Sequence, residues 1–254
     1  MPPGQDPDHS LAARLAALDA RIRAACRQAG RPDDACRLLA VAKTRSAAEI
    51  AALAALGCRD IGENYVQEAL PKMDALAGRG LRWHLIGPLQ SNKTREVAAR
   101  FDWVHSLDRE KIARRLNDQR PDDRPPLDVC LQVNIDDEGS KAGVPPAALP
   151  ELAQAVLALP RLRLRGLMTI PRPDQPAGAG NAYARLAALR QSLESVIAGP
   201  SFAGTIQPAR HPAAPALDTL SMGMSDDFEL AIAHGATWVR IGTALFGPRE
   251  RVNA

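Results

Sequence analysis

The segment Leu38-Leu39-Ala40-Val41-Ala42-Lys43-Thr44 is a short apolar run that closes on a single lysine. Its length and apolar side chains predict a buried strand over residues 37–43. A helical pattern begins directly afterwards at Ser46, and the turn between strand and helix contains no glycine. The first strand–helix unit therefore lacks the glycine-rich turn that usually follows the first strand of an open, doubly wound sheet.

The same strand–helix unit recurs along the chain. We expect strands at residues 37–43, 58–63, 81–86, 103–106, 127–135, 162–170, 220–222 and 238–241. We expect helices at residues 10–29, 46–57, 65–77, 91–100, 109–118, 146–158, 181–197 and 226–234. This alternation predicts a parallel sheet with helical crossovers. Eight units in 254 residues match the size of a (β/α)8 TIM barrel.

We expect a single domain over residues 1–254, with one extra helix ahead of the barrel and Ser10 as its N-cap. Residues 1–9 are expected to be disordered. A Pro/Gly-rich loop is expected at 171–180, and an irregular Pro-rich excursion at 200–218. Neither stretch resembles a linker between domains, because barrel units continue on both sides.

Composition excludes several functional classes. The net charge of +3 is small and the basic residues are scattered, so we expect no nucleic-acid partner. No window approaches the ~20 apolar residues of a membrane span, and the N-terminus does not resemble a signal peptide. The four cysteines form no C-x-x-C pair and have no histidine at metal-ligand spacing. We expect a cytoplasmic protein with no bound metal.

Polar side chains gather where the expected strands end. In a parallel barrel these ends open on one face, and sites form there. The residues that the strand ends bring to this rim are Lys43, Asn64, His84, His105, Gln132, Asn134, Met168, Thr169, Ser221, Arg240 and Thr243. A barrel with a purely structural role does not need so many polar groups at one rim, so the pattern favours a binding or catalytic site.

Lys43 is the most informative of these residues. A lone amine at the end of a buried strand is costly unless it is used, and an amine that is partly removed from water becomes a nucleophile toward aldehydes. The alternative is that Lys43 extends to solvent and has no chemical role.

The loops after the seventh and eighth strands predict a phosphate site. Gly223 and Gly242 let backbone N–H groups approach an anion closely, and Ser221 and Thr243 add hydroxyls. These two loops are the usual phosphate site of a (β/α)8 barrel. An amine opposite a phosphate cradle suits a phosphorylated aldehyde. The cofactor that is a phosphorylated aldehyde with an aromatic ring is pyridoxal 5′-phosphate (PLP).

The chain resembles the pyridoxal phosphate homeostasis protein family, whose members are similar to the N-terminal barrel of alanine racemase. The most specific motifs are WHLIGPLQSNK at 83–93, LSMGMSD at 220–226 and VRIGTALFG at 239–247. Further matches lie at 39–44, 61–68, 104–108, 132–134, 140–143 and 165–168. The matches run in order from about residue 10 to residue 248.

The resemblance implies that Lys43 holds PLP as a Schiff base. The other cofactor-binding residues that it implies are Asn64, His84, Met168, Ser221, Gly223, Arg240, Gly242 and Thr243. Among these, the residues of the last two loops would hold the phosphate, Arg240 would face the pyridine nitrogen, and Asn64 and His84 would line the ring. Family members often have lysine at the position of Arg45. The arginine of this chain cannot form a Schiff base. Lys141 matches a family lysine in a loop that is implied to take part in handing the cofactor over.

Two functions share such a pocket: a racemase-like PLP enzyme, and a carrier that holds PLP and passes it to apo PLP-dependent enzymes. Racemases of this fold add an acid/base group from a second β domain and from a partner subunit. Only residues 248–254 follow the last barrel loop, so we expect a non-catalytic, monomeric carrier. A less favoured alternative is a Schiff-base aldolase, with Glu63 as its acid/base group.

Overall fold

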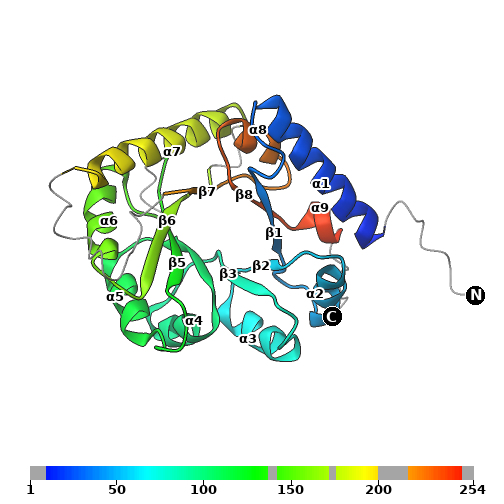
Figure 1. Ribbon diagram of the computed structural model, residues 1–254, viewed down its shortest axis with the longest axis horizontal. Coiled ribbons are helices and arrows are strands. Elements are labelled where there is room, and N and C mark those ends of the chain that lie inside the picture. Colours follow the sequence, from blue (N-terminus) through cyan, green and yellow to red (C-terminus); the bar gives the residue numbers. More distant parts are fainter. Residues whose placement is uncertain (1–9, 137–141, 172–175, 200–216, 248–254) are drawn as a thin grey trace, which may run out of the picture.

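Eight parallel strands form a closed barrel in the order of the chain, and β8 pairs with β1 to complete it (Figure 1). The computed structural model describes residues 10–136, 142–171, 176–199 and 217–247. The strands are β1 Arg37–Val41, β2 Asp60–Glu63, β3 Arg82–Leu85, β4 Trp103–Leu107, β5 Leu127–Gln132, β6 Leu162–Met168, β7 Thr219–Ser221 and β8 Trp238–Ile241. The predicted (β/α)8 barrel is confirmed.

Helices surround the barrel on the outside (Figure 1). They are α1 Leu11–Gln28, α2 Ala47–Ala55, α3 Val66–Ala75, α4 Thr94–Arg100, α5 Glu110–Gln119, α6 Leu149–Leu157, α7 Pro176–Ile197, α8 Phe228–Ala233 and α9 Thr243–Phe246. Short 3₁₀ turns, η2 Ser91–Lys93 and η3 Pro146–Ala148, precede α4 and α6. The additional N-terminal helix α1 packs against α8 and α9, where Arg14 Nε donates to the Leu245 carbonyl at 2.7 Å.

Local sequence explains where the first helices begin. Ser10 Oγ accepts a hydrogen bond from the Ala13 amide at 3.1 Å, as expected of an N-cap residue. Ser46 and Glu49 form a capping box at the start of α2, each side chain accepting from the other's backbone amide. The second cap, Ser46, lies five residues after the end of β1 and so confines Lys43 to a short turn.

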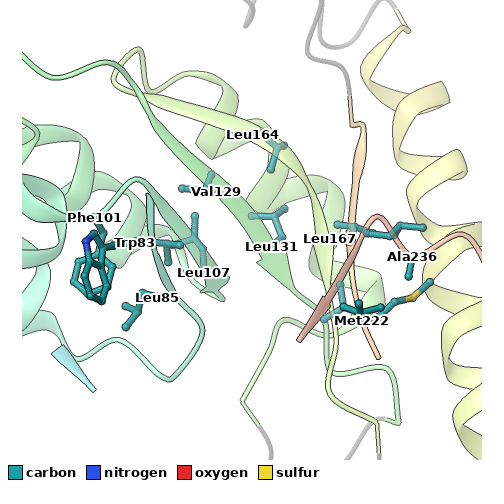
Figure 2. Close-up of a cluster of buried hydrophobic side chains, with 14 of the residues drawn as sticks. Trp83, Leu85, Phe101, Leu107, Val129, Leu131, Leu164, Leu167, Met222 and Ala236 are labelled. Carbon is teal, nitrogen blue, oxygen red and sulfur yellow. The ribbon is translucent and has the colours of Figure 1, made fainter. Parts of the chain in front are cut away.

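Most of the hydrophobic core lies between the outer face of the barrel and the helices. Leu85, Leu131 and Leu167 point outward from β3, β5 and β6 and are fully buried there. Figure 2 shows part of this cluster, which Phe101 and Met222 extend. Burying this apolar layer is the main term that stabilises the helices against the strands.

The inside of the barrel is different, because it mixes aromatic and polar side chains. The rings of His84 on β3 and Trp238 on β8 lie 5.2 Å apart between centroids, although these strands are not neighbours. They therefore meet across the barrel interior. Trp103 stacks on His84 with an interplanar angle of 10°. This interior carries several of the polar residues that the sequence predicts for the rim.

Some predicted boundaries were wrong. Residues 176–180 were expected in a loop but belong to α7, because proline is well tolerated in the first turn of a helix. The helix expected at 226–234 begins only at Phe228, and the short helix α9 was not predicted. The predictions for residues 1–9, for Lys141, for 172–175 and for 200–216 lie outside the described residues. Across the part of the chain that is described, no helix has the length and apolar composition needed to cross a bilayer.

Candidate functional site

Lys43 lies in a tight turn two residues beyond β1. The Arg45 amide donates to the Ala42 carbonyl at 3.0 Å, which closes the turn around Lys43. Thr44 has a φ of 63°, and it is the only non-glycine residue with positive φ among those described. A β-branched residue in this region of φ/ψ space is strained. The Lys43 side chain is partly buried, and no ion pair involves it within the described residues.

Helix α3 holds this turn from outside the barrel. Lys72 Nζ donates to the Ala42 carbonyl at 2.9 Å and to Glu63 Oε1 at 2.7 Å. The Thr44 amide donates to Glu68 Oε2 at 3.2 Å. Thr44, Glu68 and Lys72 were not among the residues predicted from the sequence. The sequence does contain a signal for Glu68 and Lys72, because they are four residues apart and so lie on one face of the helix that follows β2.

Glu63 is not a free acid that faces Lys43. Its carboxylate is fully buried and paired with Lys72, and Oε2 has no hydrogen-bond partner among the described residues. Burial raises the pKa of Glu63, and the hydrogen bond from Lys72 only partly offsets the shift. The contact with Lys72 of α3 places the carboxylate on the helix side of β2. The aldolase alternative therefore loses the acid/base group on which it depended.

The loop after β8 lies directly beside the strand that leads to Lys43. A Cβ placed on Gly242 would lie 3.5 Å from the Val41 carbonyl oxygen, and Ala40 pairs with Ile241 in the sheet. Thr243 is exposed and opens α9, whose first amides have no acceptor within the helix. The predicted phosphate loop and the predicted Schiff-base lysine are thus adjacent.

The loop after β7 also requires glycine. Gly223 has a φ of 91°, and a Cβ there would lie 2.6 Å from the Ala231 Cβ. Ser225 does not cap the following helix, because Asp227 is the N-cap of α8. Asp227 Oδ1 instead accepts from the Met224 amide at 2.7 Å and closes the loop locally.

Ser221 and Arg240 contact each other inside the barrel. Arg240 Nη1 donates to Ser221 Oγ at 2.9 Å, and Arg240 Nη2 donates to the Thr169 carbonyl at 2.9 Å. Ser221 Oγ also lies 2.8 Å from His105 Nδ1. The Ser221 hydroxyl therefore already has partners within the protein, and its predicted contact with phosphate remains a prediction.

Asn64 carries an unsatisfied polar atom. Its Oδ1 is buried and has no hydrogen-bond partner among the described residues. A Cβ on Gly87 would lie 2.2 Å from the Asn64 carbonyl oxygen, so only glycine allows the β3 loop to approach so closely. An orphaned amide oxygen beside a strand end suits a site that receives a polar ligand.

His84 and Met168 are fully buried within the barrel. His84 contacts Asp60 and His105, and Met168 packs with Trp103 and Cys130. The structure thus places the predicted residues in two groups: a rim group with Lys43, Asn64, Gly223, Gly242 and Thr243, and an interior group with His84, Met168, Ser221 and Arg240. In the described residues, no cluster of His, Cys, Asp or Glu could hold a metal ion.

The fold and the lysine-bearing rim define a barrel of the alanine racemase N-terminal type, and the family model described as "Alanine racemase, N-terminal domain" matches residues 13–250. The chain is 53% identical to the pyridoxal phosphate homeostasis protein of Pseudomonas aeruginosa, over 95% of this chain and 96% of that protein. It is 49% identical to the protein of the same name from Escherichia coli K12, over 95% and 98%. The chain belongs to the pyridoxal phosphate homeostasis protein family.

Solved structures agree with this assignment. PipY of Synechococcus elongatus PCC7942, whose structure is described as having PLP bound, is 35% identical with a TM-score of 0.78, and the match covers 94% of this chain and all of that one. Alanine racemase from Corynebacterium glutamicum is 17% identical with a TM-score of 0.59, over 94% of this chain and 62% of that one. The racemase likeness shows a shared barrel fold and nothing more.

Proposed function

We propose that this protein holds PLP as a Schiff base on Lys43 and serves as a cofactor carrier in PLP homeostasis. The observation that carries the proposal is the adjacency of Lys43 to the glycine loop after β8. The Lys43 amine adds to the aldehyde carbon, a C=N bond forms, and the aldehyde oxygen leaves as water. The PLP-bound structure of PipY and the names of the relatives support this proposal.

The residues present fit PLP. Gly223 and Gly242 lie in the loops that follow β7 and β8, and glycine lets backbone amides approach a phosphate closely. The orphaned Asn64 Oδ1 offers an acceptor at the rim. Arg240 would face the ring nitrogen, and a guanidinium there disfavours protonation of that nitrogen because like charges repel. When bound, PLP supplies an electron sink, which is weaker when its ring nitrogen is unprotonated.

A carrier is supported over a racemase by how the chain aligns with its relatives. It is 53% identical to the P. aeruginosa homeostasis protein and matches 96% of that protein's length. Glu63, the carboxylate at the end of β2 next to β1, is paired with Lys72 and turned toward α3. The proposal includes a monomeric state and transfer of PLP to apo PLP-dependent enzymes.

Mass spectrometry of the borohydride-reduced protein tests the Schiff base. The protein is incubated with PLP, reduced and digested, and we expect a pyridoxyl adduct on the peptide that contains Lys43. Lys93, which lies in η2 and pairs with the partly exposed Glu96 at 3.8 Å, is the internal control and should stay unmodified. Uptake of PLP with no adduct on Lys43, or equal labelling of both lysines, would contradict the assignment.

Incubation with L-alanine tests the carrier against the enzyme. A carrier produces no D-alanine above the background of free PLP. Steady racemisation that disappears in a Lys43→Ala variant would instead establish the racemase-like alternative. Light scattering of the purified protein reports the oligomeric state, and activation of an apo PLP-dependent enzyme by the loaded protein reports transfer.

A further inference from the structure

A chain of hydrogen bonds crosses the barrel interior from β8 to β2. Arg240 Nη1 lies 2.9 Å from Ser221 Oγ, and Ser221 Oγ lies 2.8 Å from His105 Nδ1. His105 Nε2 lies 3.0 Å from His84 Nδ1, and His84 Nε2 lies 3.0 Å from Asp60 Oδ1. All five residues are buried. These hydrogen bonds link Arg240 of the candidate site to Asp60, which is the first residue of β2 and lies at the opposite face of the barrel.

Both ends of this chain have a fixed hydrogen-bonding character. Arg240 can only donate, because a guanidinium has no acceptor. Asp60 can only accept while it is ionised. Burial opposes ionisation of Asp60, but the hydrogen bonds from His84 and Arg82 outweigh burial and lower its pKa. Arg82 binds both carboxylate oxygens at 2.6 Å and so holds Asp60 as an anion.

Burial favours the neutral form of the two histidines between these ends. Burial lowers the pKa of His84, although the hydrogen bond to Asp60 opposes the shift. Burial lowers the pKa of His105 well below its usual value, and His84 and Arg240 lower it further. The charged groups that act on the pair are Asp60, Arg82, Asp102 and Arg240. A neutral imidazole has one donor and one acceptor nitrogen, so each ring transmits the direction of its neighbour's hydrogen bond.

We propose that His84 and His105 are positioning residues, both held in the Nε2–H form, which direct the Ser221 proton toward His105 and leave a Ser221 lone pair to accept from Arg240. Asp60 takes the His84 Nε2 proton, so His84 Nδ1 accepts from His105 Nε2. His105 Nδ1 then accepts from the Ser221 hydroxyl. Since one end only donates and the other only accepts, this arrangement cannot reverse by passing protons along the chain.

The arrangement fixes the guanidinium from two sides. Ser221 Oγ accepts a hydrogen bond from Arg240 Nη1, and the Thr169 carbonyl accepts one from Arg240 Nη2. Without His105 Nδ1 as its acceptor, the Ser221 hydroxyl could rotate its proton toward Arg240. The proton would then oppose the hydrogen bond from Arg240 Nη1 to Ser221 Oγ. The effect of His84 and His105 on a bound cofactor rests on the proposed function, because it acts through Arg240. The tautomeric state of the two rings does not depend on it.

Nitrogen-15 NMR of histidine-labelled protein without added PLP tests the tautomers directly. Long-range proton–nitrogen correlation at neutral pH should show both rings neutral, with the proton on Nε2 in each. His84→Gln and His105→Gln assign the signals, and His234→Gln, a residue outside the chain of hydrogen bonds, is the matched control. A proton on Nδ1 of His105, or an imidazolium at either position, would overturn the proposal, because at least one of the hydrogen bonds made by the two histidines would then run in the other direction.

Retention of PLP provides a second readout. Glutamine at position 105 keeps one donor and one acceptor, whereas leucine removes both. We expect His105→Leu to weaken retention about tenfold, as losing one buried hydrogen bond would, and to shift the absorption band of bound PLP. His105→Gln should restore most of both. Leu131→Ala, a buried packing change on the outer face of β5, controls for loss of stability.

The two proposals fail in distinguishable ways. If the wild-type protein takes up no PLP, the proposed function fails, while the NMR tautomers still decide the positioning role. If PLP is bound and His105→Leu retains it with an unchanged spectrum, the positioning role fails while the carrier function stands. If His105→Leu does not fold, the tautomers of the wild-type protein give the decisive result.

Discussion

The ammonium of Lys72 joins the buried carboxylate of Glu63 to the Ala42 carbonyl, one residue before Lys43. The pair is nearly inaccessible, with side-chain exposures of 12% for Lys72 and 0% for Glu63. The hydrogen bond from Lys72 to the Ala42 carbonyl gives this buried charged pair a structural role at the end of β1. It fixes the backbone from which the Lys43 side chain projects, and the strained Thr44 follows directly.

Lys72→Met should destabilise the protein, because it leaves Glu63 buried without its cation. We expect a loss of about 3–5 kcal/mol in the free energy of unfolding, measured by urea denaturation. Adding Glu63→Gln should recover part of this loss. Lys93→Met removes a partly exposed pair with Glu96 and should cost less than about 1 kcal/mol. Similar losses for the two lysine variants would contradict the role assigned to Lys72.

Asp60 and Glu63 should contribute to the pH dependence of stability with opposite signs. The folded pKa of Asp60 lies below its usual value of 3.8, so its contribution is present above 3.8 and is lost as the pH falls. The folded pKa of Glu63 lies above its usual value of 4.5, so stability is lost as the pH rises through the window above 4.5. Chemical denaturation across acid pH checks both. Asp60→Asn should flatten the acid loss of stability, and Glu63→Gln should remove the opposing slope.

Thr44→Asn should stabilise the turn that carries Lys43. Asparagine tolerates a φ near 63° better than a β-branched residue does. We expect a gain of about 0.5–1 kcal/mol in the free energy of unfolding by thermal or urea denaturation. Thr44→Val keeps the branching and is the control that should give no gain. Destabilisation by asparagine would show that Thr44 makes a contribution other than its backbone conformation.

The two glycines of the predicted phosphate cradle should respond differently to alanine. Gly223→Ala places a Cβ 2.6 Å from Ala231 at positive φ, and we expect a loss of about 2–4 kcal/mol of stability. Gly242→Ala meets its nearest neighbour at an ordinary 3.5 Å and should fold normally. It should nevertheless weaken PLP retention about tenfold, because the methyl group hinders approach of the phosphate to the amides. Equilibrium dialysis and thermal melts separate the two effects.

Lys43→Ala should remove the visible absorption band of the PLP-loaded protein while leaving its melting temperature nearly unchanged. The band should disappear because it requires a C=N bond to this amine. The melting temperature should change little because the Lys43 side chain is only partly buried. Lys93→Ala is the matched control and should keep the band. A Lys43→Ala protein with a normal spectrum would place the linkage on another lysine.

The repeating pattern of the sequence was sufficient to predict the barrel. Apolar runs alternate with helical patterns, and hydrophobic burial favours only a parallel sheet covered by helices for such an alternation. The position of Lys43 at a strand end and the glycine loops at 223 and 242 were likewise readable, since local chain geometry sets them. Boundaries such as Pro176 were missed because proline signals both a loop and the first turn of a helix.

Closure of the barrel decided everything that joins distant segments. His105 and Ser221 are 116 residues apart in the chain and share a hydrogen bond only because β4 and β7 face the same interior. Periodicity indicates which face of a strand a side chain occupies, but not which side chain it meets across the barrel. The partners of Glu63, Ser221 and Arg240 depend on strand register and on the shape of the packed interior, and these exist only once the chain has folded.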